Sequence, residues 1–372
     1  MKRIVLSANT SWYIWNFRRV LVERGHREGH SMWVVAPQDG YSAKLVEAGC
    51  QFQNIDIDNQ GTNPLKDLRT VAAYLGLYRR LVPDAVLHFT IKPVIYGSVA
   101  ARLLGIPVVN TIPGLGTVFS KGGFVQELVK GLYRASQRKV HRVFFQNGED
   151  RDLFVRNGLV APEQAVRVPG SGVNLNRFRP GPFVGPGEKF VFLLLGRLIW
   201  DKGVGEYVAA ARIMKSRHAD VLFQIMGFTD VENPGAVRRD QVEQWVRQGV
   251  IEFLGASDEV EKSMRSADCV VLPTYYGEGI PRSLLEAHAM GKPVIASDHV
   301  GCREVVQDGV SGLLCKPKDV DDLVLKMEAM RSMDPDLRRK MGEAARIKAV
   351  EAFDEDKVAN QYFSCIQAMF DR

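Results

Sequence analysis

A turn in the second half of the chain carries residue types that bind a diphosphate. An apolar run ends at Gly196, and Arg197 and Lys202 flank the start of the next predicted helix. The free N–H groups and the dipole at a helix N-terminus attract anions, and two cations beside it strengthen that attraction. The GxxxxGK[ST] pattern of a P-loop is absent. The turn therefore predicts a diphosphate seat, and the alternative is an ordinary strand–helix turn with two solvated cations.

A second segment carries two glutamates, Glu278 and Glu286, eight residues apart. Pro281 begins a predicted helix, so the amides of Gly279 and Ile280 are expected just outside its N-terminus. One carboxylate would accept hydrogen bonds from sugar hydroxyls and the other from a ribose. The alternative is a helix-capping glutamate followed by a surface glutamate.

The composition defines the kind of molecule that holds these segments. A chain of 372 residues with 46% hydrophobic and 25% charged residues is long enough for two cores, and the composition excludes a disordered, collagen-like or coiled-coil protein. The apolar runs fall short of the roughly 18 residues that a membrane span needs, and no signal peptide is predicted. Five scattered cysteines without a CxxC pair favour a reducing, cytosolic compartment over disulfides or structural zinc.

Both halves of the chain alternate short β-rich runs with helix-length segments, which predicts an α/β protein with two parallel sheets. Proline and glycine gather at residues 169–172 and 179–187, where we place the linker between the halves. Ligands of open α/β sheets bind beyond the carboxyl ends of the strands, so two such sheets would enclose a site in the cleft between them.

The charge is divided unevenly between the halves. Residues 1–180 hold 24 Lys and Arg against 13 Asp and Glu, whereas residues 181–372 hold 25 against 30. A basic half joined to an acidic half indicates that the first half faces an anionic surface or ligand.

The two site segments also resemble a known family. Glu278 to Glu286 matches the E-x7-E motif of retaining glycosyltransferases with two facing Rossmann-like domains, the GT-B fold. Gly196-Arg197-Leu198 with Lys202-Gly203 resembles the diphosphate-binding stretch of glycosyltransferase family 4. The resemblance spans nearly the whole chain. It implies a GT-B fold with an interdomain cleft, an acceptor-side domain over 1–180 completed by a C-terminal helix over 354–372, and a nucleotide-sugar domain over 181–353.

The resemblance also implies roles for the site residues. Arg197 and Lys202 would bind the donor diphosphate and offset the charge that develops on the leaving nucleotide, which is where fixed cations help most. Glu278 would hold the transferred sugar and Glu286 the ribose. The remaining donor-binding residues implied are Gly279, Ile280, Gly172, Val173 and Leu285.

The family usually works without a metal, and no cofactor is expected beyond the donor substrate, a UDP-sugar. Asp56-Ile57-Asp58 matches the DxD string of metal-dependent glycosyltransferases, but it closes a predicted strand with no nucleotide seat beside it. We interpret this string as structural.

Strings in the first half resemble a bacterial subgroup that extends polyprenyl-diphosphate-linked sugars for capsule, O-antigen and glycoprotein oligosaccharides. The residues implied in acceptor or cleft contacts are Ser11, Trp12, Arg18, His88, Lys92 and Gly114. Two alternatives remain open, namely tryptophans that pack on the sheet and a satisfied core histidine at position 88. Several relatives carry a catalytic histidine where this chain has Pro113, so no general base is named.

A segment from Lys121 to Arg142 predicts a partner surface. Basic residues recur about every four positions beside Phe124, Val125, Leu128, Val129 and Leu132. The basic residues of this expected stripe are Lys130, Arg134, Arg138, Lys139 and Arg142. Such a helix can lie on anionic lipid headgroups, with about 1 kcal/mol from each nearby cation. The alternative is a solvated surface stripe.

The sequence thus predicts a retaining, metal-independent glycosyltransferase. It would move a hexose or N-acetylhexosamine from a UDP-sugar to a polyprenyl-diphosphate-linked saccharide at the cytoplasmic membrane face, with no role for nucleic acid. The alternatives are a UDP-sugar epimerase of similar fold and a non-catalytic nucleotide-sugar-binding subunit. An NAD-dependent oxidoreductase is disfavoured because no GxGxxG follows the first strand.

Overall fold

The computed structural model describes residues 1–58, 63–116, 119, 123–181, 188–229, 231 and 233–371. They form two compact units, Met1–Gly172 with Glu355–Arg372, and Val173–Asp354. The division falls at Gly172, before the boundary at residue 180 that the sequence indicates. Residues 182–187 of the expected linker lie outside the described residues, as does Lys121.

Unit 1 is built on a parallel sheet of seven strands in the order β3-β2-β1-β4-β5-β6-β7. Its strands are β1 (Arg3–Ser7), β2 (Ser31–Ala36), β3 (Gln51–Asn54), β4 (Ala85–Phe89), β5 (Val108–Ile112), β6 (Arg142–Phe145) and β7 (Ala165–Arg167). The central strands β4 and β5 are buried along their whole length, as expected for a sheet covered on both faces.

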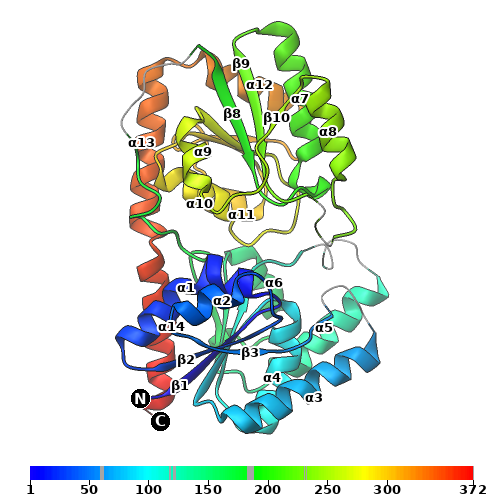
Figure 1. The fold of residues 1–372 in the computed structure, drawn as a ribbon, viewed down its shortest axis with the longest axis vertical. Coiled ribbons are helices and arrows are strands. Elements are labelled where there is room, and N and C mark those ends of the chain that lie inside the picture. Colours follow the sequence, from blue (N-terminus) through cyan, green and yellow to red (C-terminus); the bar gives the residue numbers. More distant parts are fainter. Residues whose placement is uncertain are drawn as a thin grey trace. The chain divides into compact units, whose positions relative to one another are not determined.

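Helices cover both faces of this sheet (Figure 1). One face packs against α1 (Ser11–Arg27), α2 (Ser42–Glu47) and α14 (Glu355–Phe370). The other packs against α3 (Pro64–Leu81), the π-helix η1 (Pro93–Gly97), α4 (Ser98–Leu103), α5 (Phe124–Ser136) and α6 (Gly148–Arg156). Strand β1 serves both cores because its side chains alternate, with Ile4 and Leu6 on one face and Val5 on the other.

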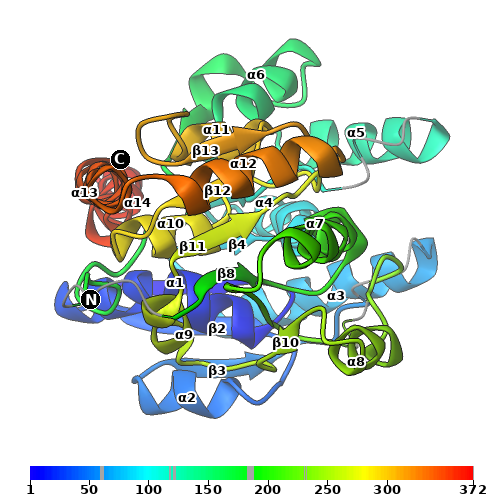
Figure 2. The same cartoon turned by 90° about the horizontal axis from the view of Figure 1, so that it is seen from above.

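Unit 2 repeats the plan with six parallel strands in the order β10-β9-β8-β11-β12-β13. They are β8 (Phe190–Leu195), β9 (Val221–Met226), β10 (Glu252–Phe253), β11 (Cys269–Leu272), β12 (Val294–Ser297) and β13 (Leu313–Cys315). The helices are α7 (Val204–Arg217), α8 (Arg239–Arg247), α9 (Val260–Ser266), α10 (Arg282–Ala289), α11 (Val300–Val305), α12 (Val320–Ser332) and α13 (Pro335–Ala352). One buried core of this unit takes side chains from α7, α8 and α12 and the other from α9, α10 and α11, whereas α13 contributes Met341 to the first and Ala349 to the second. Figure 2 shows α7 and α8 on the opposite side of the unit from α10 and α13.

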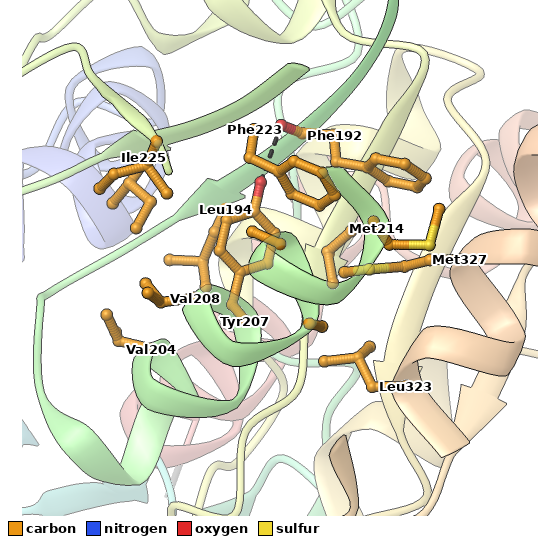
Figure 3. Packing of buried hydrophobic residues seen from close by; sticks show 14 of the residues in the cluster. Phe192, Leu194, Val204, Tyr207, Val208, Met214, Phe223, Ile225, Leu323 and Met327 are labelled. Atoms are coloured by element: carbon orange, nitrogen blue, oxygen red, sulfur yellow. Dashed lines mark hydrogen bonds between the residues drawn. The ribbon is translucent and has the colours of Figure 1, made fainter. Parts of the chain in front are cut away.

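The packing of α7 on β8 fixes the turn between them. Tyr207 on α7 is fully buried, and its hydroxyl donates to the carbonyl oxygen of Phe192 at 2.8 Å (Figure 3). Phe192 and Leu194 face this helix, whereas Leu193 and Leu195 enter the opposite core. Because the tyrosine is satisfied by a strand carbonyl, α7 is held to β8 by a polar contact as well as by apolar packing.

Within the described ranges, no helix combines the length and the apolar character needed to cross a membrane.

Candidate active site

Glycines bring the carboxyl ends of three strands of unit 2 close together. A Cβ atom on Gly227, after β9, would overlap the carbonyl oxygen of Gly196, after β8. A Cβ atom on Gly203, before α7, would overlap the carbonyl oxygen of Pro273, after β11. Gly203 also has a φ of +77°, which a residue with a side chain rarely adopts. The backbone therefore approaches at distances that only glycine permits, and the turns carrying Arg197, Lys202 and Glu278 become neighbours.

Lys202 and Glu278, predicted from separate segments, form an ion pair in the structure. Their side chains are only 12% and 13% exposed. The loop that carries Glu278 is fastened to the turn that carries Lys202, because the Tyr275 N–H donates to the Asp201 carbonyl oxygen at 2.8 Å and the Thr274 hydroxyl donates to the same oxygen at 3.2 Å. The pair is thus held by its backbone as well as by its charges.

Arg197 lies on the same group of loops. Its side chain is exposed, and its guanidinium carbon lies 5.7 Å from the centre of the Tyr276 ring, two residues before Glu278. This cation–π contact places a second positive charge near the Lys202–Glu278 pair while leaving it open to solvent. Two cations and one carboxylate therefore gather beyond β8 and β11.

Helix α10 begins beside this group. Pro281 precedes its first residue, and both Gly279 and Ile280 are buried at that end. A Cβ atom on Gly301 would overlap the carbonyl oxygen of Gly279, so α11 packs directly on this backbone. Helix α10 thus presents its N-terminus at the carboxyl edge of the sheet, as an anion seat requires.

Glu286 lies one turn into α10 and is paired with a residue that the sequence analysis missed. The Arg282 Nε donates to Glu286 Oε1 at 3.0 Å, and the glutamate side chain is 14% exposed. Burial raises the pKa of Glu286 above its usual value despite this arginine. The i,i+4 spacing of Arg282 and Glu286 is a signal from which the pair could have been predicted. The neighbouring Leu285 is fully buried in the core, so its side chain is closed to a ligand.

Gly172 and Val173 have packing roles where the chain passes from one unit to the other. Gly172 has a φ of +72°, and a Cβ atom there would overlap the backbone of Glu355. Val173 is fully buried, and its N–H donates to the Phe353 carbonyl oxygen at 2.7 Å. Both residues are buried, and their contact with a donor stays a prediction.

In unit 1 the N-terminus of α1 is occupied by the chain's own side chains. The Trp12 N–H donates to an Asp39 carboxylate oxygen at 3.0 Å, and the Tyr13 N–H donates to the Thr10 hydroxyl at 3.1 Å. The Ser11 hydroxyl donates to the Pro37 carbonyl oxygen at 2.9 Å. Asp39 thus lies where a ligand's anion would lie, and the Trp12 amide and the Ser11 hydroxyl are already bonded. Packing of the partly exposed Trp12 side chain on an acceptor stays a prediction.

Arg18, the first of two interior acceptor candidates, is 1% exposed. Its guanidinium carbon lies 4.7 Å from the centre of the Phe89 ring and 5.7 Å from that of Tyr362 on α14. It therefore ties α1 to β4 and α14 instead of lying at a surface.

His88 is fully buried. Its Nε2 is 2.7 Å from the Tyr78 hydroxyl and its Nδ1 is 3.0 Å from Asn110 Oδ1. Burial lowers the pKa of His88 to about 4, so the ring is neutral at pH 7. The structure thus has the satisfied core histidine that the sequence left as an alternative.

Lys92 and Gly114 lie beyond strand ends of unit 1. Lys92 follows β4, and its Nζ is 2.8 Å from Asp67 Oδ1, with both side chains about 15% exposed. Gly114 follows β5 with a φ of +142°. Of the six acceptor candidates, Trp12, Lys92 and Gly114 combine a place at the carboxyl edge of the sheet with partial exposure.

The basic stripe expected along one helix is wrong, because α5 ends at Ser136 and Arg142 begins β6. Lys130 pairs with Glu127 at 2.8 Å, and Arg134 donates to the Asn157 carbonyl oxygen at 2.9 Å. Val129 and Leu132 pack on the core, and Arg142 is partly buried with its guanidinium bonded to the His141 carbonyl oxygen. The exposed members are Val125, Leu128, Arg134, Arg138 and Lys139, and the side chain of Phe124 lies outside the described part.

Two parallel α/β units with anion-binding groups beyond the strands of the second define a glycosyltransferase of the GT-B fold. Solved structures support this fold across the whole chain. A glycosyltransferase from Rickettsia africae is 16% identical with a TM-score of 0.81, covering 99% of this chain and 98% of that one. Anabaena HepE in complex with UDP and glucose is 18% identical with a TM-score of 0.80, covering 99% of this chain and all of that one.

Family models agree with this class and cover both units. Residues 14–170 match the glycosyl transferase 4-like domain, and residues 181–348 match glycosyl transferases group 1. This chain therefore belongs to the glycosyltransferases that join these two domains, as the sequence motifs predict.

Two curated relatives extend over most of the chain. The N,N'-diacetylbacillosaminyl-diphospho-undecaprenol alpha-1,3-N-acetylgalactosaminyltransferase of Campylobacter jejuni is 28% identical over 97% of both chains. The UDP-Gal:alpha-D-GlcNAc-diphosphoundecaprenol alpha-1,3-galactosyltransferase of Escherichia coli is 26% identical over 81% of both chains.

Proposed function

We propose that this glycosyltransferase moves a hexose or N-acetylhexosamine from a UDP-sugar to a polyprenyl-diphosphate-linked saccharide, with retention and without a metal. The contact between Lys202 and Glu278 is the observation that carries the proposal. It joins a cation suited to a diphosphate to a carboxylate suited to sugar hydroxyls, so both ends of a nucleotide sugar would be recognised in one place.

The chemistry requires stabilisation of the leaving group. When the bond between the sugar and the diphosphate breaks, negative charge grows on the nucleotide and positive charge grows on the sugar. The negative charge on the nucleotide would be stabilised by Lys202, Arg197 and the N-terminus of α10. The positive charge on the sugar would be stabilised by the Glu278 carboxylate. A single fixed donor of this kind is typically worth about 2.7–4 kcal/mol in the transition state.

The acceptor proposal is supported by the two curated relatives, since the names of both describe transfer to a sugar on diphospho-undecaprenol. Such an acceptor keeps its lipid tail in a bilayer, so we place the enzyme at the cytoplasmic face of the membrane. Retention and metal independence are supported by the E-x7-E motif and the family resemblance.

The direct test incubates the full chain with synthetic polyprenyl-diphosphate sugars and a panel of labelled UDP- and GDP-sugars. We expect transfer from one UDP-sugar, with the anomeric configuration kept and with no loss of rate in EDTA. Binding of UDP without product from any pair would contradict the enzymatic role. Inversion, or a strict need for divalent metal, would contradict the proposed mechanism.

We predict that Glu278→Gln lowers transfer about 100- to 1000-fold, because the carboxylate charge that faces the sugar and pairs with Lys202 is removed. Rates from initial product formation measure this. Glu343→Gln is the matched control, since Glu343 is an exposed partner of Arg339 on α13 of the same unit. Full activity of Glu278→Gln with an unchanged unfolding midpoint would remove Glu278 from the site.

A further inference from the structure

The carboxylate of Glu286 on α10 has only one of its two oxygens bonded within unit 2. Its Oε1 accepts a hydrogen bond from the Nε of Arg282 at 3.0 Å. For its Oε2, the described part of the chain provides no hydrogen-bond donor. The side chain is only 14% exposed, and a carboxylate with so little access to water is costly to keep charged unless its oxygens are bonded. The second oxygen is therefore suited to a donor group that a ligand brings.

The pair of Arg282 and Glu286 differs from an ordinary surface pair. Arg339 and Glu343 on α13 have the same i,i+4 spacing, but their side chains are 44% and 58% exposed. Such exposed pairs contribute little to stability, because water and salt screen both charges. Arg282 is only 15% exposed, so its charge acts on Glu286 with much less screening. The enclosed pair therefore controls the state of the carboxylate.

The other charges near Glu286 leave this task to Arg282. Burial raises the pKa of Glu286, whereas Arg282 and Arg177 oppose the rise and Glu261 adds to it. Arg177 is ion-paired elsewhere, because its Nη2 lies 2.8 Å from Glu261 Oε2 on α9. The same nitrogen also donates to the carbonyl oxygen of Asp258. Arg282 is thus the cation in direct contact with the Glu286 carboxylate.

We propose that Arg282 is a positioning residue for the donor, which holds Oε1 of the charged Glu286 carboxylate so that Oε2 accepts hydrogen bonds from the vicinal hydroxyls of a ribose. A charged carboxylate only accepts hydrogen bonds, and hydroxyl groups donate them. The contact selects ribonucleoside diphosphates over analogues that lack the ribose hydroxyls. This rests on the proposed function, in which Glu286 binds the ribose of a UDP-sugar.

The test is calorimetric titration of the full chain with UDP and with 2′,3′-dideoxy-UDP. The parent chain should bind UDP more tightly, because the analogue leaves the carboxylate unbonded. Arg282→Gln should weaken UDP binding about 10- to 100-fold, as expected for the loss of hydrogen bonds to a charged group. Binding of the dideoxy analogue should change little. Equal weakening of both nucleotides would overturn the proposal, because Arg282 would then contact the phosphates directly.

Two further variants separate positioning from a role in stability. Arg282→Lys keeps a positive charge four residues before Glu286 and should restore part of the affinity for UDP. Arg339→Gln is the matched control, since it removes the arginine of the exposed pair on α13, and it should leave both affinities unchanged. Unchanged UDP affinity in Arg282→Gln with a lower unfolding midpoint would make the pair purely structural and overturn the proposal. Failure of Arg282→Lys to exceed Arg282→Gln in affinity would do the same.

Donor kinetics provide a second readout. The ribose lies away from the bond that breaks, so Arg282→Gln should raise KM for the UDP-sugar with little change in kcat. An equal fall in kcat and in kcat/KM would contradict a positioning role at the ribose.

The binding assay also distinguishes this proposal from the proposed function, because it needs no acceptor. Ribose-dependent binding of UDP without transfer to any acceptor would contradict the proposed function and leave the role of Arg282. A parent chain that transfers sugar but binds UDP and its dideoxy analogue equally would overturn the role of Arg282 and leave the proposed function.

Discussion

The hydrogen bonds and contacts of individual polar residues in this protein are made with residues of other helices and strands. His88 receives a hydrogen bond from Tyr78 on α3 and bonds to Asn110 on β5, and Arg18 lies among aromatic rings from α1, β4 and α14. Such fully bonded or enclosed groups are costly to charge or to expose. These two residues therefore support the architecture of unit 1.

We predict that His88 lowers the stability of unit 1 as the pH falls from about 6.5 toward 4. Asp150 of the same unit opposes this effect below about pH 6, because burial raises the pKa of its carboxyl group to about 6. Burial lowers the pKa of His88 from 6.5 to about 4, so the unfolded chain binds a proton in this window that the folded chain does not. The contribution of His88 to stability is complete above its unfolded pKa and decreases below it by about 1.4 kcal/mol per pH unit. Urea midpoints measured across this range report the slope.

The matched variants are His88→Gln and Tyr78→Phe. His88→Gln removes this titrating group and leaves Asp150, so the stability of the variant relative to the parent chain should rise as the pH falls from about 6.5 toward 4. Tyr78→Phe removes one hydrogen bond at 2.7 Å but keeps the imidazole, so it should lower stability while keeping the slope. An unchanged slope in His88→Gln would show that other groups cause the acid sensitivity.

At the scale of elements, the proposed donor site depends on how closely the loops beyond the strands approach one another. Strands β8, β9 and β11 end in turns whose backbones touch at Gly196, Gly227, Gly203 and Pro273. These contacts, with the bonds of the β11 loop to Asp201, place Lys202 beside Glu278. The turns after β8, β9 and β11 thus position the side chains of the site by packing against one another.

We predict that Gly203→Ala disrupts this arrangement strongly. The new methyl group would overlap the backbone carbonyl of Pro273, in addition to the strain at a φ of +77°. We expect a cost of several kcal/mol in the unfolding of unit 2 and a large loss of transfer, because Lys202 would be displaced. Urea unfolding and initial rates measure these effects.

Gly249→Ala provides the comparison. Gly249 has a φ of +67° but no atom within 4 Å of the added Cβ atom, so only the backbone strain of about 1–2 kcal/mol applies. Equal costs for the two substitutions would mean that the close approach at Pro273 relaxes without consequence.

At the scale of the whole molecule, unit 1 is completed by the end of the chain. Helix α14 supplies Val358, Tyr362, Phe363, Ile366 and Met369 to its core. The Tyr362 hydroxyl also lies 2.8 Å from that of Thr111 on β5. Each large apolar side chain is worth about 1.5–3 kcal/mol when buried, and a typical domain has a net stability of about 5–15 kcal/mol.

Removal of residues 355–372 should therefore unfold unit 1 while unit 2 stays folded, since unit 2 has its own two cores. Amide hydrogen exchange should show lost protection over residues 1–172 and retained protection over 173–354. A chain ending at Phe370 keeps α14 and should behave as the full chain does. Protection of unit 1 in the shorter chain would refute the structural role of α14.

The sequence alone determined the α/β class, the two parallel sheets and the segments of the donor site, because hydrophobic periodicity and short motifs are local properties. It also placed Arg197, Lys202, Glu278 and the N-terminus of α10 at strand ends. Only the tertiary structure decided which charged and polar groups remain available to bind a ligand. Asp39 accepts a hydrogen bond from the Trp12 amide, Asp67 pairs with Lys92, and Glu127 pairs with Lys130. Such pairing depends on contacts between distant segments, so spacing along the chain could not reveal it.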